Sequence, residues 1–151
     1  MNNKGFTLVE LLVTLVLLGI IATISITGVV SVMNNSKNSE YKVLLKNIDT
    51  GAKMFYEDCE YGSLRGKDIC KNNRTISGDE TEITYTIPIS AFTQYGFLTG
   101  NSSGEVVNPK TNKPLNENCT VTVTYNKSSR KYTITKANTI SVSGTSVSCF
   151  D

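Results

Sequence analysis

The sequence of 151 residues contains no histidine and no tryptophan, and only three prolines. Without histidine, the usual general base of a serine or cysteine triad is missing, and so is a frequent zinc ligand. The four cysteines also form no C-x-x-C pair, the other common basis of a zinc site. We therefore expect a protein that is not an enzyme and that uses no cofactor and no metal ion.

Two charged segments could still bind ligands. An acidic segment could contribute to a cation site, and a basic segment could attract nucleic acid or another anionic polymer. The acidic residues are Asp79, Glu80 and Glu82, and the basic residues are Lys127, Arg130, Lys131 and Lys136. We expect the acidic segment to be a solvated turn. Nucleic acid is not the expected partner of the basic one, because only Tyr125 and Tyr132 offer aromatic platforms there.

Charge is scarcest in residues 6–32, FTLVELLVTLVLLGIIATISITGVVSV, where Glu10 is the single charged residue. As an α-helix this stretch would be about 40 Å long, more than the ~30 Å hydrocarbon core of a bilayer. A helix that is apolar on every face belongs in lipid or inside a bundle of helices. It is too long for the apolar region of a secretory signal peptide and ends at no clear cleavage site.

Glu10 needs a partner, because an ionised group in an apolar segment costs a few kcal/mol. A plain single-pass anchor would leave it unexplained. If the chain were cut between Gly5 and Phe6, the new α-ammonium group would lie one helical turn before Glu10. The carboxylate would also face the positive end of the helix dipole.

The segment Lys4-Gly5-Phe6-Thr7-Leu8-Val9-Glu10, followed by this apolar run, resembles the class III leader of type IV pilins and type II secretion pseudopilins. The resemblance implies that residues 1–5 are a leader peptide, removed by a membrane-embedded prepilin peptidase that also methylates the nitrogen of Phe6. It implies that Glu10 guides docking into a filament. One departure is Thr27, which stands where many members have a helix-bending proline.

The resemblance also implies a function and its partners. The chain would be a prepilin, held in the cytoplasmic membrane with its N-terminus inside, and then a subunit of a pilus at the cell surface. It would polymerise with identical or related pilins, with the help of an assembly ATPase and a platform membrane protein. Two alternatives stay open: a pseudopilin of a type II secretion or competence system, or a permanently anchored surface binding domain.

Residues 33–151 are expected to form an extracellular head. Apolar residues at 3–4 spacing predict an amphipathic helix over about 40–60, and Gly, Asn and Asp predict a loop over 61–80. Alternating β-branched residues predict strands in the region 81–151, at 82–89, 119–125, 131–136 and 139–148, with a short helix near 90–98. The expected fold class is α+β, with a long N-terminal helix on a small antiparallel sheet of three to four strands.

All four cysteines lie in this head, at Cys59, Cys70, Cys119 and Cys149. Their even number on an exported anchor predicts disulfides in an oxidising exterior. Three pairings are possible. Locality favours Cys59 with Cys70, a closure worth about 3 kcal/mol in the chain-entropy model, and so Cys119 with Cys149. A regular meander would separate the second pair unless the last strand breaks at Gly144, so the pairing stays open.

Overall fold

The computed structural model describes residues 6–142 and 145–150, and of residues 24–28, 142 and 145 it describes the backbone alone. The predicted leader, and the positions of Thr27 and Gly144, therefore lie outside what is described in full. The chain divides into two compact units, Met1–Ser39 and Glu40–Asp151. Each is taken by itself below.

The first unit is helical and leaves its apolar side chains uncovered. Helix α1 runs from Leu8 to Tyr61, and in its early turns the side chains of Leu8, Leu15 and Val32 are more than half exposed. Two threonine hydroxyls in this stretch donate to backbone carbonyls one turn back, Thr14 to Leu11 and Thr23 to Ile20. These bonds satisfy the hydroxyls without water, which suits an apolar environment.

Within the described residues, no helix is both long enough and apolar enough to cross a bilayer. The membrane anchor expected over residues 6–32 stays a prediction.

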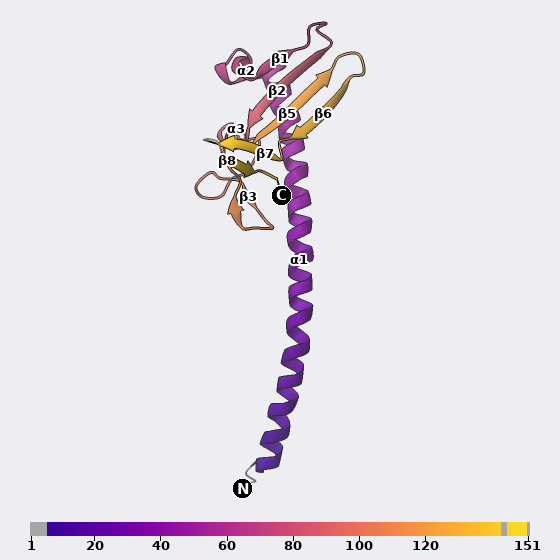
Figure 1. Ribbon diagram of the computed structural model, residues 1–151, viewed down its shortest axis with the longest axis vertical. Coiled ribbons are helices and arrows are strands. Elements are labelled where there is room, and N and C mark those ends of the chain that lie inside the picture. The colour runs from indigo at the N-terminus through magenta and orange to yellow at the C-terminus, as the bar shows by residue number, and fades with distance from the viewer. Residues whose placement is uncertain (1–5, 143–144, 151) are drawn as a thin grey trace. The chain divides into compact units, whose positions relative to one another are not determined.

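In the second unit, one face of α1 is buried. Ile48, Ala52, Phe55 and Cys59 recur at 3–4 spacing and are almost completely inaccessible to solvent. Figure 1 shows this end of α1 (magenta) beside the strands of the unit. Because the residues of that face are apolar and its opposite face is mostly polar, this part of α1 is held mainly by burial rather than by helix propensity.

The main sheet has four antiparallel strands in the order β1-β2-β5-β6. They are β1 (Arg74–Ile76), β2 (Glu82–Pro88), β5 (Thr120–Asn126) and β6 (Lys131–Lys136). Tyr85 of β2 lies opposite Val123 of β5, which lies opposite Ile134 of β6. The predicted class, α+β with a long N-terminal helix and an antiparallel sheet of three to four strands, is confirmed.

Alternation along the strands builds the core between helix and sheet. Alternate residues of β2 and β5 are buried, and they form one cluster with the apolar face of α1. Phe55 meets Tyr85 edge to face, with ring centroids 6.2 Å apart. On the other face of the sheet, Thr84 and Thr124 are hydrogen-bonded across the strands at 2.9 Å. One face is therefore apolar and the other wet, as period-2 alternation requires.

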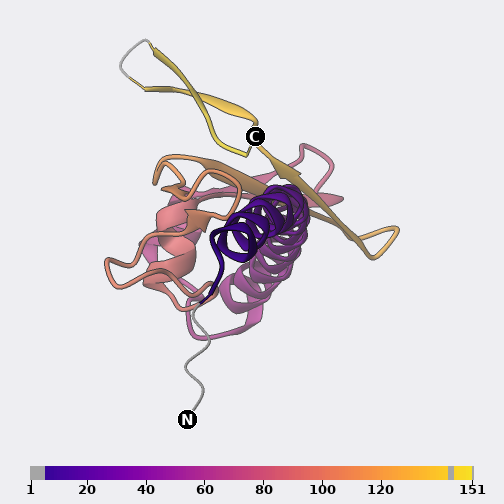
Figure 2. The same ribbon diagram turned by 90° about the horizontal axis from the view of Figure 1, so that it is seen from below.

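Two expectations about strands are wrong. Residues 139–148 do not add a strand to the main sheet: they form β7 (Thr139–Val142) and β8 (Thr145–Ser148), which pair only with each other among the described residues. In Figure 2 this hairpin (yellow) points away from the four-stranded sheet. The fourth strand is instead β1, from the segment 61–80 that was expected to be a loop.

The segment 61–80 is more ordered than its composition suggests. Besides β1 it holds a short helix, α2 (Asp68–Asn72). A turn stabilised by Asp79, whose carboxylate accepts hydrogen bonds from Ser77 and Thr81, returns the chain from β1 to β2. Three residues are too few for an alternation signal, so β1 is decided by its pairing with β2.

The remaining connection carries a helix and a small sheet. Helix α3 (Ile89–Gln94) buries Ile89, Ala91 and Phe92, and the chain turns after it at Gly96, whose φ is +78°. Strands β3 (Val107–Asn108) and β4 (Lys113–Pro114) form a two-stranded sheet. The short helix near 90–98 was therefore correctly expected, whereas these two short strands were not.

Candidate processing and assembly site

The residues implicated in processing lie at the start of α1. Gly5, which would precede the cut, lies outside the described residues. Phe6, which would become the first residue of the mature chain, is 78% exposed, and α1 begins two residues later at Leu8. The described side of the Gly5–Phe6 bond therefore lies in an exposed segment ahead of the helix.

Thr7 and Glu10 cap the helix reciprocally. The Glu10 carboxylate accepts hydrogen bonds from the backbone N–H and the hydroxyl of Thr7, both at 2.9 Å. The backbone N–H of Glu10 donates to the Thr7 hydroxyl oxygen at 3.3 Å. This is a capping box, which satisfies two N–H groups that have no partner inside the helix. Its sequence signal is the T-x-x-E spacing of Thr7 and Glu10, which was not among the predicted features.

The cap gives Glu10 a second role beside the one inferred from the sequence. It keeps the carboxylate at the first turn, next to the residue whose nitrogen cleavage would expose. Both hydrogen bonds that the carboxylate accepts come from neutral groups, so they do not neutralise its negative charge. In an apolar environment that charge still requires a cation, because an unpaired buried charge costs several kcal/mol.

Two disulfides close the head. Cys59 at the end of α1 is bonded to Cys70 of α2, and Cys119 is bonded to Cys149. This is the local pairing, and the disulfide prediction is confirmed. The second bridge forms because β7 and β8 reverse the chain, and the N–H of Cys149 then donates to the carbonyl of Asn138 at 2.8 Å. The reversal that the sequence analysis required is therefore present.

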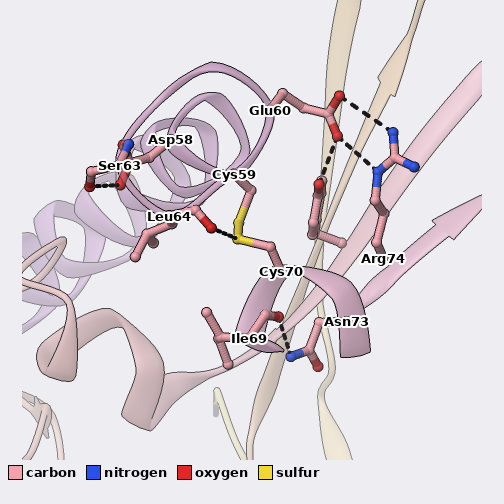
Figure 3. The surroundings of a disulfide bond; sticks show 10 residues. Asp58, Cys59, Glu60, Ser63, Leu64, Ile69, Cys70, Asn73 and Arg74 are labelled. Carbon is pink, nitrogen blue, oxygen red and sulfur yellow. Dashed lines mark hydrogen bonds and ion pairs between the residues drawn. A yellow bond between two sulfur atoms is a disulfide. The ribbon is translucent and has the colours of Figure 1, made fainter. Parts of the chain in front are cut away.

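The Cys59–Cys70 bridge is surrounded by polar contacts that fix the end of α1 (Figure 3). Asp58 accepts a hydrogen bond from the backbone N–H of Ser63, and Glu60 forms an ion pair with Arg74 at 2.9 Å. Glu60 also accepts a hydrogen bond from the Tyr85 hydroxyl at 2.7 Å. Burial raises the pKa of the Glu60 carboxyl, but the bonds from Arg74 and Tyr85 outweigh it, so this pKa lies below its usual value.

Glu60→Gln should therefore destabilise the head at neutral pH, by about 1 kcal/mol for a partly exposed charged group. A carboxyl group whose pKa is lower in the folded state stabilises the fold at pH values above its pKa in the unfolded chain, here 4.5. This stabilisation is lost as the pH falls through the lower pKa of the folded state. The difference between wild type and variant should shrink in acid. Urea unfolding across this pH range measures it, with Glu117→Gln as an exposed control. A difference that does not change with pH would contradict this assignment.

The two charged segments singled out in the sequence are engaged in the fold. Asp79 accepts bonds from Ser77 and Thr81, which lower the pKa of its carboxyl to about 2. In the part of the chain that is described, no cluster of acidic residues and cysteines could hold a metal ion. In the basic segment, Lys136 forms an ion pair with Asp49 of α1. Asp79 therefore stabilises a turn, Glu82 accepts a hydrogen bond from Asn126 across the β2–β5 pair, and Lys136 ties β6 to α1.

The described chain has the α+β arrangement that the pilin resemblance predicts. It combines an exposed apolar helix, which begins with a cap that contains an acid, with a disulfide-closed head in which a helix packs on an antiparallel sheet. Residues 1–26 match the family described as "Prokaryotic N-terminal methylation motif". The resemblance to type IV pilins is thus confirmed in the N-terminal segment.

One curated relative is the type IV major pilin protein PilA of Myxococcus xanthus, 39% identical over 57 residues. The match covers 38% of this chain and only 26% of that protein. No solved structure matches significantly.

Proposed function

We propose that the chain is a prepilin: a structural subunit of a type IV pilus or a related filament, cleaved after Gly5 and methylated at Phe6. The observation that carries the proposal is the match of residues 1–26 to the methylation motif, at the head of a helix whose apolar side chains are exposed. A helix of this kind is not stable in water as it stands.

The physical sequence of events follows from that exposure. The precursor rests in the cytoplasmic membrane, its N-terminus inside and its head outside, where disulfides persist. Once the helix leaves lipid, its apolar surface has to be buried on neighbouring helices, so polymerisation and extraction are coupled. The resemblance supplies the partners of these steps: a prepilin peptidase, an assembly ATPase and a platform membrane protein.

Glu10 sets the offset between subunits in this scheme. Its carboxylate is held at the first helical turn by Thr7, and the nearest new cation is the α-ammonium group of a mature Phe6, in the same chain or in its neighbour. Subunit offsets that leave the charge unpaired are strongly disfavoured. One buried acid thus selects one register among many that apolar packing alone would allow.

Intact-mass measurement of the chain from sheared surface filaments and from membranes tests the proposal. We expect a mature chain that begins at methylated Phe6 in the filaments and a precursor in the membranes. A chain that retains residues 1–5 everywhere, with no filaments, would instead favour a permanently anchored surface domain. Filaments confined to a secretion apparatus would identify a pseudopilin.

A further inference from the structure

The solvent face of α1 in the second unit is mostly polar but carries three exposed apolar residues. Among the described residues of this unit, four large apolar side chains are strongly exposed: Val43 (57%), Met54 (52%), Tyr61 (76%) and Ile76 (43%). The first three are spaced by 11 and 7 residues, close to three and two full turns, so they lie on one face. That face is opposite to the buried one, and nothing within the unit covers it.

The two ends of this face differ in shape. At the C-terminal end, Met54, Tyr61 and Phe97 line a shallow hollow of about 460 Å³, with Glu57 and Asp58 also in its lining. At the other end, about 27 Å away at ~1.5 Å per residue, the Val43 side chain is exposed on the helix surface. One end therefore offers a recess and the other an apolar side chain that could enter it.

Positive charge predominates beside Val43, where Lys42 and Lys46 outnumber Glu40, and negative charge predominates at the hollow, where Glu57 and Asp58 outnumber Lys53. Val43 is flanked by the exposed residues Lys42 and Lys46, and neither forms an ion pair with any residue that the structure describes. At the hollow, Asp58 is engaged by Ser63, whereas Glu57 is exposed and, among the described residues, accepts only a long bond of 3.4 Å from the Tyr132 hydroxyl. Glu57 is thus available to an ammonium group from outside the unit.

We propose that this face joins the heads of successive copies: Val43 of one copy docks in the Met54–Tyr61–Phe97 hollow of the next, with its lysines against Glu57. The inference rests on the proposed function, which orients all copies alike in the membrane. The two patches differ and lie about 27 Å apart along α1 at ~1.5 Å per residue, so the contact is head-to-tail and shifts each copy along the helix axis. Such a contact gives an open helical array rather than a closed ring. The contact therefore fits a filament. Besides Glu10 in the apolar core, its charges would be a second feature that sets the offset between subunits.

The first test is cross-linking in cells that produce the full chain with both Val43→Cys and Tyr61→Cys. A short bis-maleimide should give a ladder of dimers, trimers and higher species from surface filaments. Each single variant should give no ladder. A matched pair, Val43→Cys with Ile76→Cys, places the second thiol at an exposed apolar position on β1, outside the lining of the hollow, and should give none either.

The second test is charge reversal at the same contact. Lys46→Glu and Glu57→Lys should each weaken the ladder several-fold, because like charges then meet, and the double variant should restore it. Lys113→Glu, at an exposed position in β4 that takes no part in the proposed contact, should have no effect. If the double-cysteine chain forms filaments in normal yield but gives no cross-linked ladder, this contact is wrong and the proposed function is unaffected. If the wild-type chain is absent from every filament, the proposed function itself is wrong. Dimers without higher species would show a closed pair and overturn the head-to-tail contact.

Discussion

Glu10→Gln is expected to abolish incorporation of the chain into filaments while leaving membrane insertion and removal of residues 1–5 nearly unchanged. Glutamine at the third helical position can still complete the capping box with Thr7, so the helix keeps its start. It carries no charge, however, and the α-ammonium group of the mature N-terminus would lose its partner in the apolar core. Breaking a buried ion pair from one side costs about 3–5 kcal/mol per subunit, which is enough to exclude the variant from a polymer.

Two companion variants separate the charge of Glu10 from its capping role. Glu10→Val removes both and should behave like Glu10→Gln. Thr7→Ala removes the capping hydroxyl, a loss of about 1 kcal/mol, but keeps the carboxylate, so filaments should persist at reduced stability. Immunoblots of sheared surface material and of membranes measure incorporation and processing together. If Glu10→Gln polymerises as well as wild type, Glu10 is a helix cap and nothing more.

The second large effect is expected at Gly5. Gly5→Leu should trap the precursor in the membrane, with essentially no mature chain and no filaments. A peptidase must bring its catalytic groups close to the backbone at the bond it cuts, and glycine is the residue that leaves most room there. The uncut chain would also lack the α-ammonium group that Glu10 requires, so the failure should extend from processing to assembly.

The control for Gly5 is Asn3→Leu, which adds a comparable side chain two residues upstream of the proposed cut. It should leave maturation nearly intact. Intact mass and gel mobility distinguish the two forms. A mature chain that begins at Phe6 in cells producing Gly5→Leu would mean that glycine is not required, and a different mature N-terminus would place the cut elsewhere.

The head also shows which helices and strands can be predicted from the sequence and which cannot. The buried stripe that includes Ile48 and Phe55 follows from helical periodicity, and strands β2, β5 and β6 follow from alternation, because both patterns repeat over several residues. Strand β1 has only three residues, and its pairing with β2 depends on the turn at Asp79. A strand this short, set by the turn that follows it, leaves no periodic signal in the sequence.

For the hairpin of β7 and β8, the prediction failed for a different reason. Its residues alternate as a strand should, so the prediction of β structure was sound, but the partner was wrong. Partner choice is non-local: the edge of β6 was available in principle, yet the chain folds back on itself and brings Cys149 to Cys119. The β7–β8 hairpin and the Cys119–Cys149 bridge therefore depend on each other, and both require that two cysteines 30 residues apart in the sequence meet.

The sequence alone determined the apolar N-terminal stretch, the single acid within it and the cleavage-type motif around Gly5 and Phe6, because each is a property of neighbouring residues. Tertiary structure alone decided the cysteine pairing, the place of β1 and the separate β7–β8 hairpin, since these depend on distant segments competing for the same partners. It also decided that Val43, Met54 and Tyr61 stay uncovered, which is known only once every other apolar residue of the head has found its place in the core.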